Sequence, residues 1–230
     1  MPNGDPATRG RARAVAREVG IGWSAAALRV DTYQAAPADM ARYTTMNPFH
    51  WDPAWMIPVP GQPGVTSCSM EAVWQGLKIH AGETDFGMFA VRPYKRPADG
   101  LRGADFDYAG SRFLFRDIAV DLLTARLLIY LPAYLYLMDR LVADSVIEEI
   151  RAALATGTDV VFYDWDDNFA ISDPGSSFSH SALLAAWFNG DVEDQFDRAR
   201  RRLLAAHPVW AGEDLPLDRY GSVHERQVNK

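Results

Sequence analysis

The sequence predicts one α+β domain that is mainly helical and carries a small sheet. Apolar residues recur at helical spacing through several long stretches after residue 107. Short runs of β-branched and aromatic residues, at Leu28–Tyr33 and Asp159–Tyr163, predict only a few strands. The chain has 230 residues, of which 48% are hydrophobic and 12% aromatic, so it can bury a sizeable core. It contains no internal repeat and no low-complexity linker, which favours a single domain.

The two ends of the chain are expected to lie outside this domain. Residues 1–24 are predicted to form a flexible or helical N-terminal extension, with a short basic helix over Thr8–Val19 that ends at Gly20. Residues 25–207 form the domain, and residues 208–230 form a C-terminal tail. The basic residues of the extension fit a solvated helix face better than a nucleic-acid-binding arm. They are Arg9, Arg11, Arg13 and Arg17.

Composition and charge favour a soluble cytoplasmic protein and disfavour nucleic acid and membranes as partners. The net charge of −7 and the pI of about 5.2 argue against binding to nucleic acid. Cys68 is the only cysteine, so no intrachain disulfide can form, which fits a reducing compartment. The basic N-terminus lacks the apolar segment of a signal peptide. The charge-free apolar run over residues 127–138 is too short to span a bilayer, so we expect no membrane association.

The segment before residue 67 mixes short strands with irregular structure. Leu28–Tyr33 predicts a strand, Gln34–Arg42 a loop or helical turn, and Trp55–Val59 a second strand. Between Tyr43 and Pro63 the chain is rich in aromatic residues and proline. We expect this segment to pack over the core or to form one wall of a pocket.

Residues Ser67–Ala81 predict a helix whose polar face is a candidate site. Ser69 is a suitable N-cap, and it leaves Glu71 in the first turn, where a carboxylate suits the helix dipole. From spacing alone a solvated face is an equally good interpretation, but a large ring among charged neighbours usually has a ligand or another segment over it. At about 100° per residue, one sector of the helix carries Glu71, Trp74, Gln75 and Lys78. The opposite, core-facing side carries Met70, Val73, Leu77 and His80.

The pattern Glu71-x-x-Trp74-Gln75-x-x-Lys78-Ile79 resembles the E-x-x-[FYW]-Q-x-x-K-[FI] helix of the NADAR family. The approach to the helix is similar too. Asn47-Pro48-Phe49, Pro58–Gly61 and Ser69 resemble that family's Asn-Phe segment, its short strand and the Ser before the Glu. The resemblance extends from about residue 45 to about residue 190. The chain is also similar to a family of uncharacterised actinobacterial proteins with an I-P-V-P…E-x-x-W-Q-G-L-K segment.

NADAR enzymes cleave N-glycosidic bonds in ADP-ribose and riboflavin-pathway metabolites, so the resemblance implies a NADAR-like fold and this activity. It also implies an acidic residue at the end of the strand that follows Leu154-Ala155-Thr156, where this chain has Asp164. The chain then departs from the family pattern, because Ser176–His180 stands in place of a Gly-x-Asn run. This departure keeps open a non-catalytic module that binds a nucleotide or a partner on the same fold.

The loop after the Glu71 helix is basic in an otherwise acidic protein. Clustered guanidinium groups fit phosphate or pyrophosphate recognition, and scattered surface charge is the equal alternative. The residues of this loop are Arg92, Tyr94, Lys95, Arg96 and Arg102.

The rest of the chain is predicted to be helical around one strand. Tyr108–Tyr130 predicts one long helix, and Pro132 fits the first turn of the next helix, Pro132–Leu141. Ser145-Val146-Ile147-Glu148 is a capping box, and Gly157 closes the helix that it begins. The buried strand Asp159–Tyr163 follows. The later elements are a turn at Asp173–Gly175 and helices over Ser179–Asn189 and Asp191–Ala206.

The acidic residues at positions 164, 166 and 167 follow the strand Asp159–Tyr163, and sites gather at such strand ends in α/β arrangements. A solvated acidic turn is one alternative. An Asp-x-Asp pair also suggests a metal-dependent nucleotide-sugar transferase, although no nucleotide-binding half precedes it here. A calcium loop is disfavoured because Gly175 stands where a Glu ligand is needed. No spacing supports a Cys68–His nucleophile or a histidine metal site.

We therefore predict an N-glycosidase that hydrolyses an N-ribosidic bond in a nucleotide or ADP-ribosyl compound, with no metal or cofactor. The reaction passes through an oxocarbenium-like sugar, so Glu71 would bind the ribose hydroxyls or stabilise that cation. Asp164, with Asp166 or Asp167 as substitutes, would activate water. Lys78 would hold the leaving group or form an imine with a ring-opened ribose. Trp74 would stack on the base or sugar, and the basic residues would hold phosphate. The predicted substrate-binding residues are Asn47, Trp74, Gln75, Arg92, Lys95 and Arg96.

Overall fold

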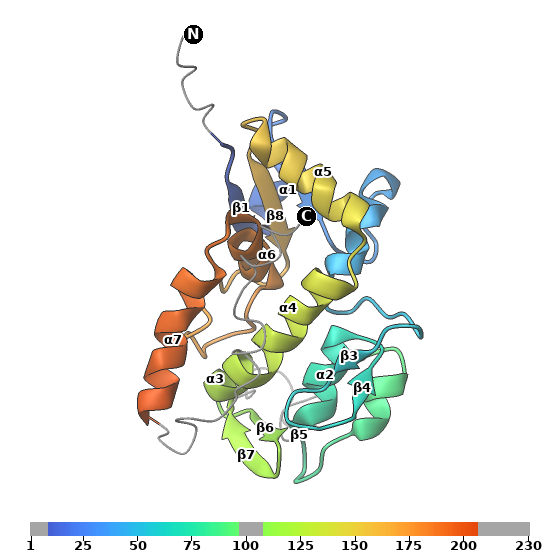
Figure 1. Ribbon diagram of the computed structural model, residues 1–230, viewed down its shortest axis with the longest axis vertical. Coiled ribbons are helices and arrows are strands. Elements are labelled where there is room, and N and C mark those ends of the chain that lie inside the picture. The colour runs from blue at the N-terminus through green and yellow to red at the C-terminus, as the bar shows by residue number, and fades with distance from the viewer. Residues whose placement is uncertain (1–8, 97–107, 207–230) are drawn as a thin grey trace.

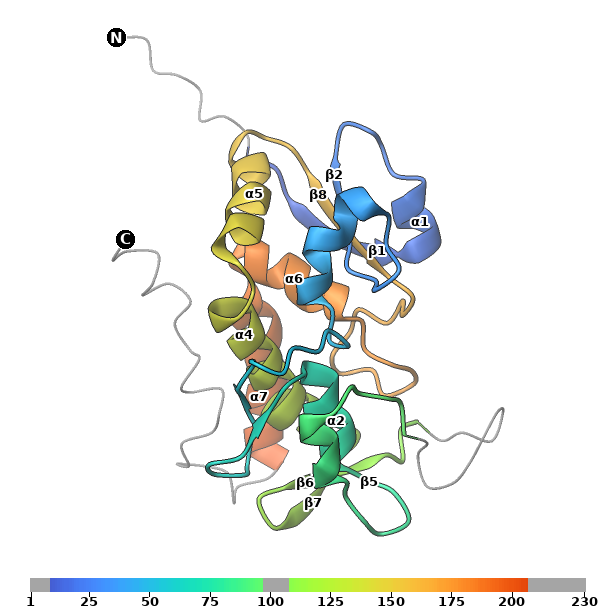
Figure 2. The same cartoon turned by 90° about the vertical axis from the view of Figure 1, so that its right-hand side faces the viewer.

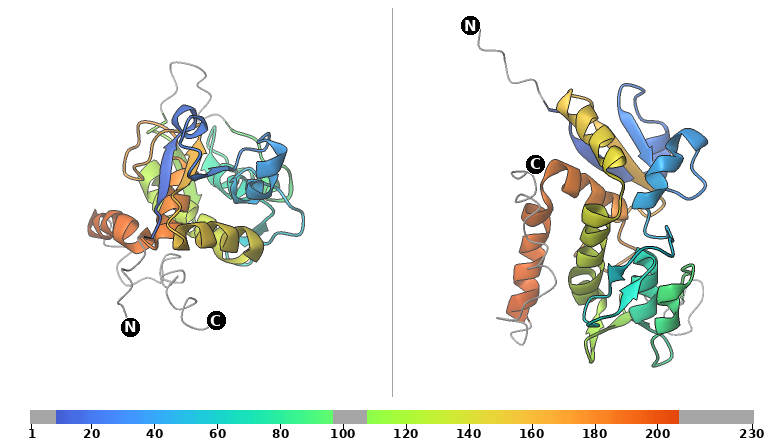
Figure 3. Two further views of the ribbon diagram at one scale, coloured as in Figure 1. Left: turned by 90° about the horizontal axis from the view of Figure 1, so that it is seen from above. Right: turned by 45° about the vertical axis from the view of Figure 1, so that its right-hand side comes forward.

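The computed structural model of the protein describes residues 9–96 and 108–206 (Figure 1). A parallel sheet lies at one end of the molecule, short antiparallel strands lie at the other, and a long helix runs between them. Figures 2 and 3 show the same arrangement from other directions. The predicted α+β class with mainly helical content is confirmed.

The parallel sheet consists of β1 (Ala12–Ala16), β8 (Val160–Asp164) and β2 (Leu28–Asp31), with β8 in the middle. The side chains of β8 are buried from Val160 to Tyr163, as expected for a strand that is covered on both faces. The strands predicted at Leu28–Tyr33 and Asp159–Tyr163 are therefore confirmed, with ends shifted by one or two residues.

The helix predicted over Thr8–Val19 is wrong. Strand β1 occupies the middle of that range, and only Arg17–Ile21 is helical, as α1. The Asn189 side chain also holds β1, because its Oδ1 accepts from the amide of Ala12 at 2.9 Å and its Nδ2 donates to the carbonyl at 3.0 Å. Pairing with β8 outweighs the local helix propensity of an alanine- and arginine-rich segment. Strand β1 of the expected extension thus belongs to the sheet, and α1 packs against it.

Helices α5 (Asp144–Ala155) and α6 (His180–Asn189) pack against this sheet. Helix α6 begins after Ser179, whose hydroxyl accepts from the amide of Ser181, and it ends at Gly190 with a φ of +78°. Helix α7 (Val192–Ala206) follows at once. These two helices match the sequence prediction.

The capping box predicted for α5 is wrong, although the helix itself is present. Helix α5 begins at Asp144, so Ser145 lies inside the first turn and Ala143 is the N-cap, with no side-chain hydrogen bond. The predicted end is correct, because Gly157 follows the C-cap with a φ of +85°, a conformation that favours glycine.

The single long helix predicted over Tyr108–Tyr130 is also wrong. Strands β6 (Arg112–Phe115) and β7 (Ile118–Asp121) form a hairpin there, and β6 also pairs with β5 (Lys78–Ile79). Along β6 the exposed Arg112 alternates with the buried Phe113 and Phe115, which is the strand period of two. The apolar residues of this segment also fit helical spacing, so their number alone predicted a helix where the period of two indicates a strand.

The helical part of that range begins only at Leu122, where the Asp121 side chain accepts from the amide of Thr124 at 2.9 Å. Helices α3 (Leu122–Ala125), η4 (Arg126–Tyr130) and α4 (Leu131–Arg140) then run without a break. Helix α4 continues η4 without a break, and Pro132 lies in its first turn, as predicted. The π-helical turn of η4 directly precedes it, and a proline inside a helix lacks the amide that regular α-helical bonding needs.

This central helix is long and apolar enough to span a membrane by length and composition alone. Its 19 residues are, however, 83% buried within the molecule over the most apolar window. Tyr134 is fully buried, and its hydroxyl donates to the carbonyl of Met46. The segment is therefore the core helix of the fold.

The other end of the molecule is built around α2 (Met70–Leu77). Strands β3 (Ile57–Pro58) and β4 (Thr66–Ser67) form a small antiparallel pair before it, so the strand predicted at Trp55–Val59 is present but short. The 3₁₀ segment η2 (Phe86–Ala90) packs against α2, whereas the 3₁₀ segment η1 (Ala38–Met46) packs against β2 at the parallel-sheet end (Figure 2). Gly76 of α2 lies against Phe89 of η2, where an added Cβ would come within 2.3 Å of the ring.

Candidate active site

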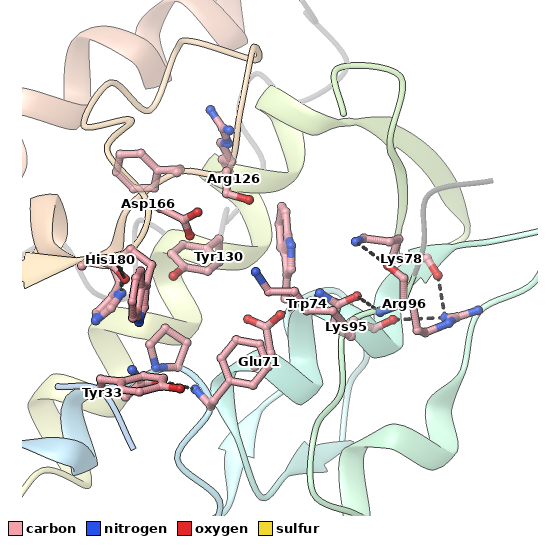
Figure 4. Close-up of a pocket in the computed structure, with 18 of the residues that line it drawn as sticks. Tyr33, Glu71, Trp74, Lys78, Lys95, Arg96, Arg126, Tyr130, Asp166 and His180 are labelled. Atoms are coloured by element: carbon pink, nitrogen blue, oxygen red, sulfur yellow. Dashed lines mark hydrogen bonds and ion pairs between the residues drawn. The ribbon is translucent and has the colours of Figure 1, made fainter. Parts of the chain in front are cut away.

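A cavity of about 960 Å³ lies between the parallel sheet, α2 and the central helix. Its lining comes from segments that are far apart in the sequence, between Tyr33 and His180. Figure 4 shows Glu71 and Asp166 pointing into this space from opposite walls. A cavity of this size can hold a nucleotide-sized ligand.

One wall of the cavity is the carboxyl end of the parallel sheet. Because β1, β8 and β2 run in the same direction, the residues that follow them meet at one edge. Arg17 follows β1, Thr32 and Tyr33 follow β2, and Trp165 and Asp166 follow β8. The sheet thus brings together side chains from three distant parts of the chain.

The opposite wall is α2, whose start is fixed by the segment before it. Ser69 is the N-cap residue as predicted, but its hydroxyl donates to the carbonyl of Pro48 at 2.9 Å instead of capping the helix. The amide of Glu71 donates to the same carbonyl at 2.8 Å. The helix ends at Leu77, so Lys78 already belongs to β5, although its side chain still lines the cavity.

The polar residues of α2 are buried, which excludes the interpretation of a solvated helix face. Glu71 is 6% exposed and Lys78 is 4% exposed. Gln75 connects this group to the next loop. Its Nε2 donates to Glu71 Oε1 at 2.7 Å, and its Oε1 accepts from the amide of Arg96 at 3.0 Å. The amide orientation of Gln75 is therefore fixed by a backbone donor, and Gln75 in turn orients the Glu71 carboxyl.

Burial shifts the ionisation of both charged groups on this wall. The pKa of Glu71 is raised by burial, against the opposing effects of the Gln75 hydrogen bond and the ammonium groups of Lys95 and Lys78. The pKa of Lys78 is lowered by burial, with Glu71 opposing. Perturbed pKa values of this kind are common among groups that take part in catalysis.

Asp164 is held by neighbouring side chains on the sheet side. Its Oδ1 accepts from the amide of Trp165 at 2.7 Å, and its Oδ2 lies 2.6 Å from His180 Nδ1 and 3.1 Å from Ser179 Oγ. Burial alone would raise the pKa of Asp164, but the His180 imidazole and these hydrogen bonds lower it to about 2. Asp164 is thus an ionised carboxylate with both oxygens engaged, which leaves it poorly placed to accept a proton from water.

His180 extends this group to β2, because its Nε2 lies 2.6 Å from Thr32 Oγ1. The row Thr32–His180–Asp164 resembles a nucleophile–base–acid triad in its contacts. The Thr32 hydroxyl, however, belongs to a residue that is 1% exposed and does not line the cavity. We therefore infer that the Thr32–His180–Asp164 contacts are structural and connect the ends of β2 and β8.

Asp166 lies two residues further on and is available to a ligand. It lines the cavity, and no hydrogen bond from a described residue occupies its carboxyl group. Burial and the negative charge of Asp164 raise the pKa of Asp166. Of the two predicted acids on this wall, Asp166 is the one with a free reactive group.

Two predicted ligand-binding residues have structural contacts instead. The Trp74 ring packs on Phe113 at a centroid distance of 4.0 Å and on Tyr130 at 5.4 Å, and the residue is 5% exposed. Asn47 Oδ1 accepts from the amide of Phe49 at 2.8 Å. Both residues line the cavity, but they hold its wall in place.

Among the described arginines predicted to bind phosphate, Arg96 is engaged by backbone carbonyls and Arg92 lies outside the cavity. Arg96 donates to the carbonyls of Gln75 at 3.1 Å, Lys78 at 2.8 Å and Glu83 at 3.2 Å, so it satisfies carbonyls at and after the end of α2. Arg92 does not line the cavity and lies 5.2 Å from the Trp51 ring. Arg102 lies outside the described residues. Lys95 does line the cavity and is the remaining basic candidate.

Sequence reasoning missed several lining residues. Tyr33 and Trp165 belong to the sheet edge, and Arg126 and Tyr130 belong to the central helix. The Arg126 guanidinium donates to the carbonyls of Asp173 and Ser176, so it fixes the loop before α6. The parallel pairing of β2 with β8 is the signal that would have placed Tyr33 beside Trp165.

Residues 25–184 match the family of unknown function DUF6939, and this range includes the cavity lining from Tyr33 to His180. No curated protein and no solved structure matches the chain. The matched range covers well over half of the chain, and the chain therefore belongs to the DUF6939 family.

Proposed function

We propose that the protein hydrolyses an N-ribosidic bond in a nucleotide or ADP-ribosyl compound. The observation that carries this proposal is the shared cavity of Glu71, Lys78 and Asp166, which brings a buried acid, a buried amine and a half-buried acid together from opposite walls. The resemblance of the Glu71–Lys78 segment to the NADAR helix supports the same chemistry. A small-molecule substrate fits the enclosed cavity. The single cysteine and the burial of the apolar central helix support a cytoplasmic location.

Loss of the base from a riboside leaves an oxocarbenium-like sugar, so the site must supply negative charge beside the anomeric carbon. Glu71 fits this role because Gln75 orients its carboxyl and the ammonium groups of Lys78 and Lys95 favour its ionised form. Asp166 faces Glu71 across the cavity and accepts a proton from the attacking water.

Lys78 completes the proposed mechanism. As an ammonium group it can hold the departing base or a phosphate oxygen. In its neutral form, which burial favours, it can form an imine with a ring-opened ribose. Asp164, which the sequence suggested as the base, instead keeps the loop with Asp166 in place through His180.

The test compares the wild type with Glu71→Gln on ADP-ribosylated nucleosides and N-ribosides, and measures release of free base or ribose. Gln keeps the size and most hydrogen bonding of Glu but removes the negative charge. Turnover should fall on the order of 10²–10³-fold while ligand affinity stays within a few-fold. Glu148→Gln, an exposed residue of α5, is the matched control and should keep full activity.

A non-catalytic binding module is the second candidate. It is favoured by the engaged carboxylate of Asp164 and by the absence of a Gly-x-Asn run at residues 176–180. Under this alternative, one of the nucleotides would raise the melting temperature of the wild type without any product release. That result would replace the enzyme proposal with the binding one.

A further inference from the structure

We propose that Tyr33 and Trp165 form the binding site for the planar heterocyclic base of the ligand. This inference rests on the proposed function and names the part of the substrate that the mouth of the cavity recognises. Both rings line the cavity, and both come from the carboxyl edge of the parallel sheet. Neither residue was predicted to belong to the site.

The exposure of the two rings points to a ligand. Trp165 is 67% exposed and Tyr33 is 40% exposed, although both border a cavity whose other aromatic residues are mostly buried. An indole with this exposure buries little apolar surface, so packing within the protein does not explain its position. Trp74, the ring first expected to stack on a base, is already covered by Phe113 and Tyr130.

A partly buried ion pair holds the two rings in place. The Arg17 guanidinium lies 4.7 Å from the centroid of Trp165 and 5.3 Å from that of Tyr33. Asp31, which is 1% exposed, accepts from both terminal nitrogens of Arg17 at 2.9 and 2.7 Å. The Tyr33 amide also donates to Asp31 Oδ1 at 3.0 Å. The rings are therefore oriented before any ligand arrives, which lowers the entropic cost of binding.

The geometry of the pair suits an aromatic base. The rings contact each other edge to face, with centroids 5.9 Å apart and planes at 80°. Every nucleobase has a π-face that can stack on such a surface, whereas ribose and phosphate have none. The acids and Lys78 belong to the same cavity, so a bound nucleoside can place its sugar near them while its base lies at the rings.

The experiment measures the affinity of Trp165→Ala for AMP and for ribose 5-phosphate, which lacks the base. AMP should bind roughly 10- to 100-fold more weakly than to the wild type, while the affinity for ribose 5-phosphate stays unchanged. Trp165→Phe should keep most of the AMP affinity. Tyr33→Ala is a second variant and should show the same selectivity. Phe169→Ala is the matched control, because Phe169 is 38% exposed near Trp165 but does not line the cavity.

The outcomes separate this inference from the proposed function. If the wild type binds AMP and both Ala variants bind it equally well, the base site is wrong and the hydrolase proposal is unaffected. An equal loss for AMP and ribose 5-phosphate would also overturn the base site, since it would indicate a general disturbance of the loop. If the wild type binds neither compound and releases no base, both proposals fail.

Discussion

At the scale of single residues, the environment gives the three acids of the cavity different ionisation. Burial raises the pKa of Glu71 and Asp166, whereas His180 and its neighbours hold the pKa of Asp164 at about 2 against the effect of burial. Divergent pKa values among neighbouring acids assign different roles to them. Asp164 is an anion that supports the structure, whereas burial disfavours the charged forms of Glu71 and Asp166.

The variants Asp164→Asn and Asp166→Asn should separate these roles. The lowered pKa of Asp164, against an ordinary value of 3.8, means that its ionised form stabilises the fold above about pH 4, and this contribution is lost as the pH falls toward 2. Asp164→Asn should therefore lower the free energy of unfolding at pH 7 by roughly 2 kcal/mol, and the melting temperature by about 4–8 °C.

Asp166→Asn should behave in the opposite way. Its raised pKa shows that the fold disfavours the charged form, so Asn should leave the melting temperature unchanged or raise it while turnover falls. Thermal melts at pH 7 and pH 3 test both statements, because the difference between wild type and Asp164→Asn should shrink at the lower pH. Equal melting temperatures for wild type and Asp164→Asn at pH 7 would contradict the supporting role of Asp164.

At the scale of elements, sequence patterns predicted those helices whose ends carry their own signals. Gly157 and Gly190 both adopt positive φ after a helix, and Ser179 caps α6, so α5, α6 and α7 were placed within one or two residues. Strand β1 and the β6–β7 hairpin were missed because their segments have helix-compatible composition. Their structure depends on partners that lie far away in the sequence, β8 for the first and β5 for the second.

The loop after α2 shows that sequence patterns are also limited in predicting which residues can bind a ligand. Its basic residues were predicted as one phosphate-binding group, but the Arg96 guanidinium is used by the carbonyls of residues 75, 78 and 83. Lys95 lines the cavity, and its Nζ lies 5.9 Å from the Phe49 ring. Only the contacts in the folded protein distinguish the structural role of Arg96 from the availability of Lys95.

Arg96→Met and Lys95→Met should therefore have different effects. Loss of the Arg96 hydrogen bonds should destabilise the protein by roughly 1–3 kcal/mol and weaken all ligands alike. Lys95→Met should leave the melting temperature nearly unchanged and weaken AMP about tenfold relative to adenosine, which lacks the phosphate. Thermal melts and calorimetric titrations provide both measurements. A selective loss of AMP affinity in Arg96→Met would return the phosphate role to Arg96.

At the scale of the whole molecule, the site depends on topology. Arg17, Tyr33 and Trp165 meet because three strands run parallel, and Glu71 reaches the same cavity from a separate α2 layer. The helix motif around Glu71 could be identified from local spacing. The base site could not, because it requires the pairing of β1 and β2 with a strand more than a hundred residues later in the chain.

The fold also bears on the rival interpretation of Asp164-Trp165-Asp166 as the metal site of a nucleotide-sugar transferase. A divalent cation between these acids would have to displace the His180, Ser179 and Trp165 donors from the Asp164 oxygens. It would also leave the His180 ring without its carboxylate partner inside the fold, which is costly for a buried pair. Release of base by the wild type should therefore proceed at an unchanged rate in EDTA. Loss of turnover in EDTA that Mn²⁺ or Mg²⁺ restores would show that the loop binds metal, and would replace the hydrolase assignment of Asp166 with a metal-dependent one.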